Sequence, residues 1–536
     1  MRADLVAVGG RVHSTLPDAA VHTGLAVRGG RILAVGRDDD VLGTAASETL
    51  VVELSGRTVV PGLIDSHIHA VRAGLTWARE VRWDGIGTLH EALETIAAAA
   101  RQRPEGMWIC VLGGWHPGQF REGRAPTKDD LDRVAPHHPV FVQQLNDGAV
   151  LNSLGLGRCR IGPGTPDPPG GRLEQDGDGV PTGRVQGTGA LTRCQAAMKD
   201  PTHEEQVEST RAFLLQLARW GITGVVDAGG FGMTPERYEP LFDLWKGGAL
   251  PLRMRLYVGP ATPGGEYEQV QAWLDRIDAE PGDAMLKPVG IGEIGIYACH
   301  DMEGLSDHNP DEQDLRRLFE VSRLVASAGL PMQLHAITQS SISAILDVWE
   351  QVDAAVGIAG RRFCLAHAER ISAQDLRRVR GLGVGILLQN RLSLRTRDSA
   401  QVWGADAARQ GAPLHAIAGL GIPFGAGTDA TRVSSPNPWT AIEWFTTGSP
   451  VDGGPARHPS QHLTRTEALR AYTEGSAWFS GEEDERGALA PGRLADFAVL
   501  SEDCFTSRSV TGLESVLTVV HGRPVHAASE FTGIAE

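Results

Sequence analysis

The sequence is poor in the features that mark secreted and membrane proteins. Its six cysteines are scattered without a C-x-x-C pair, which in a chain of 536 residues predicts reduced thiols rather than a disulfide framework. The first residues, MRADLVAVGGRVHS, contain no charged segment followed by an apolar run of signal-peptide length. No uninterrupted apolar run approaches the roughly 18 residues that a bilayer span requires. We therefore expect a soluble, cytoplasmic protein without a membrane partner.

Positive charge is also scarce, and one common hydrolase motif is missing. The 66 acidic residues outnumber the 50 basic ones, and only four of the basic residues are lysines. A net charge of −16 repels phosphate backbones, so a nucleic-acid partner is not expected. No G-x-S-x-G elbow is present, which leaves a serine hydrolase without local support. A small molecule is the expected partner.

Apolar strands that alternate with helical segments run through most of the chain. A hydrophobic content of 41% and a charged content of 22% are typical of a globular protein, and the length allows one large and one smaller domain. Eight strand–helix repeats favour an α/β fold of the (β/α)8 TIM-barrel type over an open sheet. The eight apolar runs are residues 59–70, 222–230, 251–260, 287–297, 330–336, 361–369, 383–390 and 422–430.

Both chain ends and one long interval depart from this pattern. Residues 1–60 and 486–536 contain short strands between glycine-rich turns, which predicts a small β-sandwich built from both ends of the chain. Residues 61–485 are then the barrel domain. About 150 residues separate the first two barrel strands and contain strands of their own, which predicts an insertion at about residues 75–215 that covers the barrel mouth.

Two histidines stand at the end of the first barrel strand, in PGLIDSHIH. Residues i and i+2 of a strand point to the same side, so the imidazoles of His67 and His69 project together. Barrel enzymes place their catalytic groups at this end of the strands. Because neutral imidazole is a good ligand for Zn²⁺ and related divalent metals, the pair predicts a metal site.

Three later strands also end in polar residues. LPMQLHA carries His335, RRFCLAHAE carries His367, and IPFGAGTDA carries Asp429. A satisfied core histidine would explain either histidine alone. Packing is a poor explanation for four histidines and an aspartate at the same ends of separate strands.

These motifs resemble those of the amidohydrolase superfamily, and within it the YtcJ-like branch that includes N-substituted formamide deformylases. PGLIDSHIH is similar to the branch's first-strand motif, NDGAVLNS to its insertion, and GAGTDATRVSSPNPW to its eighth strand and loop. The resemblance spans nearly the whole chain. It implies that Asp429 is the catalytic aspartate and that four histidines bind metal, namely His67, His69, His335 and His367. The ligand types favour one or two divalent ions, with Zn²⁺ ahead of Mn or Fe.

The fourth strand departs from the family's pattern. Many members carry a carboxylated lysine there, followed closely by Asp-Gly in YtcJ-like chains, whereas this strand reads LKPVGIGEIGIY. Because proline is confined to edges, bulges and first residues of strands, we expect the strand to start at Pro288 and to leave Lys287 at the bottom rim. Glu293 lies six residues on, about 20 Å nearer the catalytic face. The segment also resembles TatD-type hydrolases, in which this glutamate binds metal. Glu293 is therefore the predicted ligand, and Lys287 is the alternative.

Loop residues near the mouth complete the candidates. Trp115, His116 and Tyr297 are predicted to line the substrate pocket, with simple packing as the alternative for the aromatic residues. His300 and His308, in the loop after the fourth strand, are predicted to be ordinary loop residues.

These parts suit hydrolysis at a carbonyl group. A bound metal lowers the pKa of water from about 15.7 towards about 7 and polarises the scissile carbonyl, while Asp429 carries the proton to the leaving nitrogen. We predict a metal-dependent hydrolase of non-peptide C–N bonds in amides, formamides or cyclic amides. A homodimer is one possible oligomeric state. A heterocycle deaminase, revealed by ammonia release, is the alternative. The retained polar strand ends argue against a non-catalytic relative.

Overall fold

Parallel strands in two sheets form the centre of the molecule, seen in a computed structural model that describes residues 1–17, 19–302 and 304–534. The first sheet has the order β15-β14-β13-β7, and the second has the order β16-β17-β18-β19. Backbone hydrogen bonds join the two sheets on both sides, since Ile291 N–H donates to Pro331 O and Asp429 N–H donates to His67 O. The strands are β7 (Leu63–Ile68), β13 (Ile222–Asp227), β14 (Arg253–Val258), β15 (Leu286–Ile291), β16 (Gln333–Ala336), β17 (Cys364–His367), β18 (Gly385–Gln389) and β19 (Phe424–Gly427).

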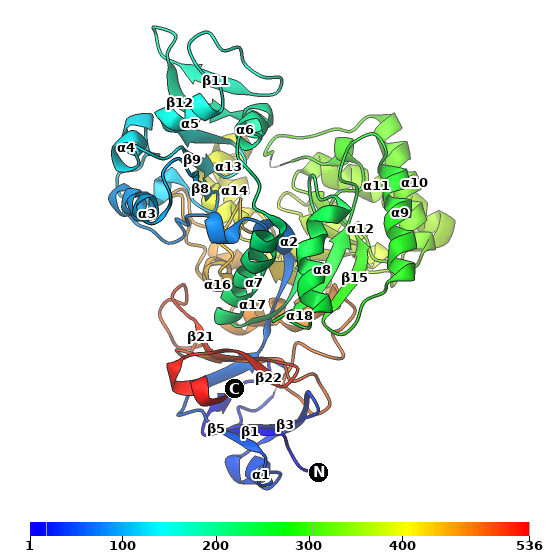
Figure 1. Cartoon of the computed structure of the whole chain (residues 1–536). Coiled ribbons are helices and arrows are strands. Elements are labelled where there is room, and N and C mark those ends of the chain that lie inside the picture. The colour runs from blue at the N-terminus through cyan, green and yellow to red at the C-terminus, as the bar shows by residue number, and fades with distance from the viewer. Residues whose placement is uncertain (18, 303, 535–536) are drawn as a thin grey trace.

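Helices follow these strands and lie outside them (Figure 1). Each of the eight predicted apolar runs overlaps a strand of the two central sheets, so the predicted α/β alternation is confirmed. Within the described part of the chain, no helix combines the length and apolarity needed to cross a bilayer. The helices after β13 are α8 (Glu239–Lys246), α9 (Glu266–Ala279), α10 (Glu312–Ser327), α11 (Gln339–Val356), α12 (Ala373–Leu382), α13 (Thr396–Trp403), α14 (Ala405–Gln410), α15 (Leu414–Gly419), α16 (Pro438–Thr447), α17 (Arg465–Ala471) and α18 (Glu474–Trp478).

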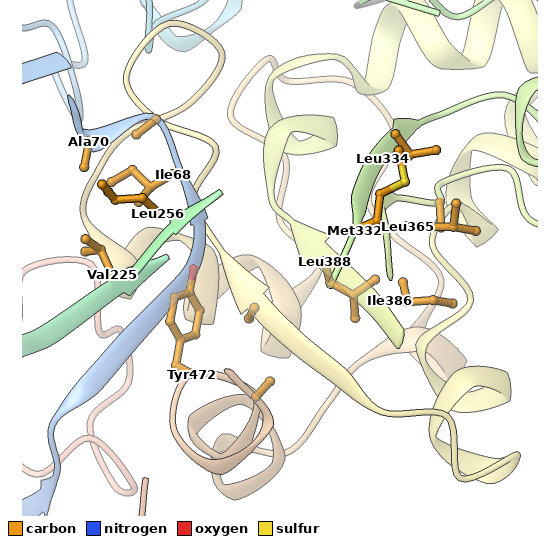
Figure 2. Close-up of a cluster of buried hydrophobic side chains, with 14 of the residues drawn as sticks. Ile68, Ala70, Val225, Leu256, Met332, Leu334, Leu365, Ile386, Leu388 and Tyr472 are labelled. Carbon is orange, nitrogen blue, oxygen red and sulfur yellow. The ribbon is translucent and has the colours of Figure 1, made fainter. Parts of the chain in front are cut away.

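The main hydrophobic core lies between these strands and the helices. Figure 2 shows two groups of its side chains, one around β7 and one around β16, which are Ile68, Val225 and Leu256, and Met332, Leu334 and Leu365. Ile68 and Ala70 belong to this core. Because successive side chains of a strand point to opposite faces, the imidazole of His67 points to the other face of β7 from Ile68. The packing of Ile68 therefore helps to fix the direction of the His67 imidazole.

Most residues between β7 and β13 form a separate layer with its own sheet, drawn in blue to cyan in Figure 1. The sheet order is β11-β12-β10-β9-β8, and the apolar side chains beneath it form two buried clusters apart from the main core. Gly114 N–H donates to Arg432 O, so this layer contacts the loop after β19. Its elements are α3 (Leu89–Gln102), β8 (Ile109–Leu112), α4 (Lys128–Val134), β9 (Val140–Gln144), β10 (Gly148–Leu151), α5 (Ser153–Arg158), β11 (Arg172–Gln175), β12 (Pro181–Gln186) and α6 (Gly187–Gln195).

The two helices at the borders of this layer pack on the strands. α2 (Ala70–Gly74) follows His69 directly, and α7 (His203–Arg219) precedes β13. α7 starts in a capping box, in which Thr202 and Glu205 each accept a hydrogen bond from the other's backbone N–H. Its buried face, which includes Phe213 and Leu217, belongs to the main core. We propose that the insertion ends before α7 rather than near residue 215.

Strands from both chain ends form two further sheets around one buried cluster. The sheet β4-β3-β1-β5 comes from the N-terminal segment, and the sheet β2-β6-β20-β21-β22 combines the two ends of the chain. Figure 1 shows them together below the centre of the molecule, in blue and red. The elements are β1 (Leu5–Val8), β2 (Arg11–Val12), β3 (Gly24–Arg28), β4 (Arg31–Gly36), α1 (Asp38–Leu42), β5 (Leu50–Glu53), β6 (Thr58–Pro61), β20 (Phe497–Leu500), β21 (Ser515–Val520) and β22 (Arg523–Ala527).

A buried ion pair ties these sheets to the central strands. Arg253 on β14 donates to both carboxylate oxygens of Asp496, from Nε at 2.7 Å and from Nη2 at 3.1 Å, and both side chains are almost fully buried. Removal of one partner from such a pair costs about 3–5 kcal/mol because the other charge is left buried and uncompensated. The pair therefore holds the terminal sheets in one orientation against β14.

Candidate metal centre

Six of the residues predicted for metal binding and catalysis come together at one end of the central strands. They come from five strands, or from the residues that follow them directly, and each is at most 4% exposed. The alternation of strand and helix thus brings residues far apart in the sequence to a single buried point. The six are His67, His69, Glu293, His335, His367 and Asp429.

The distances from His67 and His69 to the two carboxylates are those between ligands of one metal ion, whereas His335 Nδ1 and His367 Nε2 lie within hydrogen-bond distance of each other at 2.9 Å. His67 Nε2 lies 3.5 Å from both Glu293 Oε2 and Asp429 Oδ1. His69 Nε2 lies 3.4 Å from Glu293 Oε1 and 3.2 Å from Asp429 Oδ1. Ligands held about 2.0–2.1 Å from a tetrahedral Zn²⁺ are about 3.4 Å apart, which is the edge of the tetrahedron. The observed separations match that edge.

Hydrogen bonds on the far sides of two rings determine which nitrogen faces the cluster. His69 Nδ1 lies 2.9 Å from Gly229 O, and His335 Nε2 lies 2.6 Å from Met302 O. A carbonyl oxygen only accepts, so both of these nitrogens carry the proton. The lone pairs are therefore on His69 Nε2 and His335 Nδ1, which face the carboxylates of the cluster. Partners of this kind orient metal-binding histidines in proteins.

Several polar atoms of the cluster have no hydrogen-bond partner among the described residues. They are buried, and a buried polar group without a partner costs about 1–3 kcal/mol. A divalent cation bound between these atoms would remove that cost, so the donor set fits a metal. The atoms are Nδ1 and Nε2 of His67, Nδ1 of His367 and Oε2 of Glu293.

Both carboxylates of the cluster are held in their ionised form. Burial alone raises the pKa of Glu293, but the rings of His69 and His335 outweigh it and hold that pKa well below its usual range. Burial likewise raises the pKa of Asp429, whereas the adjacent imidazoles of His67 and His69 bring it well below its usual range. A bound cation would act in the same direction, because positive charge favours the ionised carboxylate.

A third carboxylate, Asp65, holds β7 and β19 together beneath the cluster. It accepts hydrogen bonds from Thr428 Oγ1 at 2.6 Å and from His67 N–H at 3.1 Å. The strands meet closely at Gly427, where a Cβ atom would lie 2.5 Å from His67 N and 2.7 Å from Asp65 Oδ1. The absence of a side chain at Gly427 thus permits the close contact, and the hydrogen bonds of Asp65 stabilise it.

The fourth strand begins earlier than the sequence predicts. β15 starts at Leu286, and Lys287 and Pro288 already pair with β14. The expected start at Pro288 is therefore wrong. The proline is tolerated because the pairing shifts register directly after it, as in a bulge. Lys287 is exposed, and the structure does not bring it to the buried cluster that contains Glu293.

The three predicted pocket residues have different surroundings. Trp115 is fully buried, and its ring packs at 4.8 Å from Trp83 and 5.6 Å from Phe120 in the core of the insertion. Its Nε1–H donates to Gln143 O. Trp115 therefore packs rather than faces a pocket. His116 Nδ1 accepts a hydrogen bond from Gly118 N–H and caps a short 3-10 turn.

Tyr297 is the pocket candidate that lies near the cluster. Its ring packs edge-on against Phe231, with 5.3 Å between the ring centroids. Phe231 packs edge-on against the ring of His300, with 4.7 Å between the centroids. His300 in turn stacks on His335 at 3.8 Å. A row of aromatic rings therefore leads from Tyr297 to the cluster.

Two residues of the loop after β15 were missed by the sequence prediction. His300 lies within 4.8 Å of the candidate ligand atoms of Glu293 and His335. Asp301 Oδ1 lies 3.0 Å from His335 Nε2, and its Oδ2 accepts hydrogen bonds from the N–H groups of Ile337 and Thr338. Asp301 thus fixes the ring of His335. Their position in a loop without a family motif gave no signal for either role.

An open groove of about 1090 Å³ lies elsewhere, between α9, α10 and α11. Both charged and apolar side chains of the outer helices line it, and none of the six cluster residues is among them. This groove is therefore separate from the metal cluster at the strand ends.

Known proteins with similar sequences and structures include metal-dependent hydrolases. The profile of the amidohydrolase family matches residues 50–526. N-substituted formamide deformylase of Arthrobacter pascens is 27% identical over 93% of this chain and 94% of its own length. YtcJ of Bacillus subtilis strain 168 is 26% identical over 90% of this chain and 91% of its own. A crystal structure of a metal-dependent hydrolase from Pyrococcus horikoshii OT3 covers 95% of this chain and 99% of its own, with a TM-score of 0.68 at 20% identity.

Fold and site together define a hydrolase that uses a divalent metal to cleave C–N bonds. The chain belongs to the amidohydrolase family, because the profile covers it from β5 to β22. The predicted resemblance to the YtcJ-like branch is confirmed by the two relatives. The structural similarity confirms the α/β fold.

Proposed function

We propose that the chain hydrolyses a non-peptide C–N bond in a small amide, formamide or cyclic amide, with water activated at one or two divalent metal ions. The observation that carries this proposal is the position of Glu293. It shares one group of candidate ligands with His67 and His69, and a second group with His300 and His335. A carboxylate common to two such groups would help to hold one or two divalent ions.

The cluster would hold the metal as follows. His67, His69 and Glu293 would bind one ion, and Glu293, His335 and His367 would bind a second. Zn²⁺ is the first candidate, because imidazole and carboxylate are its usual ligands beside thiolate. Mn and Fe use the same ligand types, so the metal itself has to be identified by measurement.

The metal, when bound, supplies water of lowered pKa and polarises the scissile carbonyl. Asp429 would carry the proton, since its Oδ1 lies 3.2 Å from His69 Nε2 and its carboxylate belongs to the same cluster as the candidate ligands. As a carboxylate it accepts a proton from the attacking water and then donates that proton to the leaving nitrogen. The nitrogen departs as an amine, and the acyl part leaves as a carboxylate.

The proposed architecture is a barrel with a small β-sandwich at the chain ends. The hydrogen bonds that join the two central sheets on both sides support a closed (β/α)8 barrel within residues 61–485. The two terminal sheets and their common core support a β-sandwich made of residues 1–60 and 486–536. A small molecule is the proposed partner, with no nucleic acid at a net charge of −16, and a homodimer is compatible with this arrangement.

A substrate panel tests the reaction type. Purified enzyme loaded with Zn²⁺ would be given N-alkylformamides first, because a relative is named for that activity, and then N-acyl amines, cyclic amides and amino-heterocycles. Release of an amine together with a carboxylate, followed by chromatography and mass spectrometry, supports the proposal. Ammonia release from an amino-heterocycle alone would instead identify a heterocycle deaminase.

Glu293 and Lys287 make opposite predictions for the fourth strand. Glu293→Gln keeps the size of the side chain but removes the charge that a bridging ligand needs, so metal content and turnover are both expected to fall steeply. Lys287→Arg is the matched control, because this exposed side chain lies at the other end of β15. It should keep both. Elemental analysis and the rate with an accepted amide are the measurements.

The reverse result would assign the ligand to a carboxylated Lys287. Loss of metal in Lys287→Arg, together with an added CO₂ mass on the lysine of the native protein, would remove Glu293 from the site.

A further inference from the structure

His300 occupies a fixed position directly beside the metal cluster. Its ring stacks on His335 with an interplanar angle of 17°, and Phe231 contacts its edge. The side chain is 6% exposed. Two rings therefore hold the imidazole of His300 in one orientation.

One hydrogen bond settles the state of this imidazole. The backbone N–H of Met302 donates to His300 Nδ1 at 2.9 Å. A nitrogen that accepts a hydrogen bond carries no proton, so the ring is neutral and its proton is on Nε2. A protonated Nε2 has no lone pair to offer a metal. His300 thus differs from His69 and His335, whose far nitrogens are the protonated ones.

The proton on Nε2 has no acceptor among the described residues. Nε2 of His300 is buried and has no hydrogen-bond partner among the described residues, although the ring lies beside Glu293 and His335. A buried donor without an acceptor is unfavourable by about 1–3 kcal/mol. The arrangement is that of a donor held ready for an acceptor that arrives with a ligand.

We propose that His300 is a catalytic residue that donates a hydrogen bond from Nε2 to the carbonyl oxygen of the substrate during attack by water. This inference rests on the proposed function. The oxygen gains negative charge as the tetrahedral centre forms, so a fixed N–H donor binds the transition state more tightly than the ground state. Phe231 and Tyr297 continue the same wall and would contact the apolar part of the substrate.

The test compares three variants at the same loop. His300→Phe keeps a flat ring for stacking on His335 but removes the donor, so kcat should fall by about 10²–10³-fold while KM changes little. Metal content should equal that of the native enzyme. His300→Gln, whose amide can donate, should recover part of kcat. His308→Phe is the control, since His308 lies in the same loop. Its ring contacts Ala298 O, and its backbone is hydrogen-bonded to Ser340 and Ser341. This variant should change kcat much less.

Two results would overturn the proposal. Loss of metal from His300→Phe would make His300 a ligand, and an unchanged kcat would make it a packing residue. A readout without turnover separates this failure from failure of the proposed function. Acetohydroxamate, a small amide-shaped probe, should bind metal-loaded His300→Phe about tenfold more weakly than native protein. Equal binding by calorimetry contradicts the role of His300 whether or not any amide is hydrolysed.

Discussion

Removal of metal is expected to abolish hydrolysis and to leave the fold in place. A chelator should strip about one to two equivalents of divalent metal per chain, in keeping with the one or two sites proposed, and added Zn²⁺ should restore the rate. His67→Ala should lose both metal and activity, because both nitrogens of His67 are buried within the cluster and have no other partner among the described residues. The circular dichroism spectrum should barely change, since His67 is not part of the main hydrophobic core.

His90→Ala is a suitable control for His67→Ala, because His90 is an exposed residue of the insertion outside the cluster. It should keep metal and activity. Active native protein that contains no metal by elemental analysis would rule out the proposed chemistry as a whole.

Replacement of Asp429 by asparagine should lower turnover by about 10²–10⁴-fold, the usual worth of general acid–base catalysis. The amide has the same shape but accepts no proton at neutral pH. Metal content should fall much less, because the histidines and Glu293 remain. Turnover of an accepted amide and elemental analysis, measured on the same preparation, separate the two effects.

The alternative for Asp429 is a turn cap, which asparagine would serve nearly as well. Among the described residues, the carboxylate faces imidazole nitrogens, and no backbone N–H donates to it. Turnover close to that of the native enzyme in Asp429→Asn would nevertheless establish the capping role and leave the proton transfer without a residue.

The metal cluster was accessible from sequence because its residues stand at strand ends. Side chains alternate between the two faces of a strand, and the ends of parallel strands lie on the same side of the barrel fold. These two rules were enough to predict that His67, His335 and Asp429 lie close together. The side chain of Glu293 follows the same rule at the end of β15. Six predicted residues are therefore found in a single cluster.

These rules fail where tertiary contacts determine the position of a side chain. Trp115 stands in a loop-like segment, yet the insertion uses it as a core residue against Trp83. Pro288 lies inside a strand because a register shift accommodates it. His300 and Asp301 acquire their positions from a loop whose path depends on contacts with β16 and α11, and no local pattern encodes such a path.

The pairing of β6 with β20 has a consequence for the chain as it is made. Val59 on β6 pairs with Val499 on β20. The ribosome must therefore synthesise most of the chain before β20 can pair with this edge of β6. At about 5–20 residues per second, the interval is on the order of half a minute. Throughout that time an apolar strand edge is open beside the strand that carries His67, and open edges pair readily with other chains. A translational pause before β20 emerges would therefore expose nascent molecules to aggregation while the strands of their metal site are already synthesised.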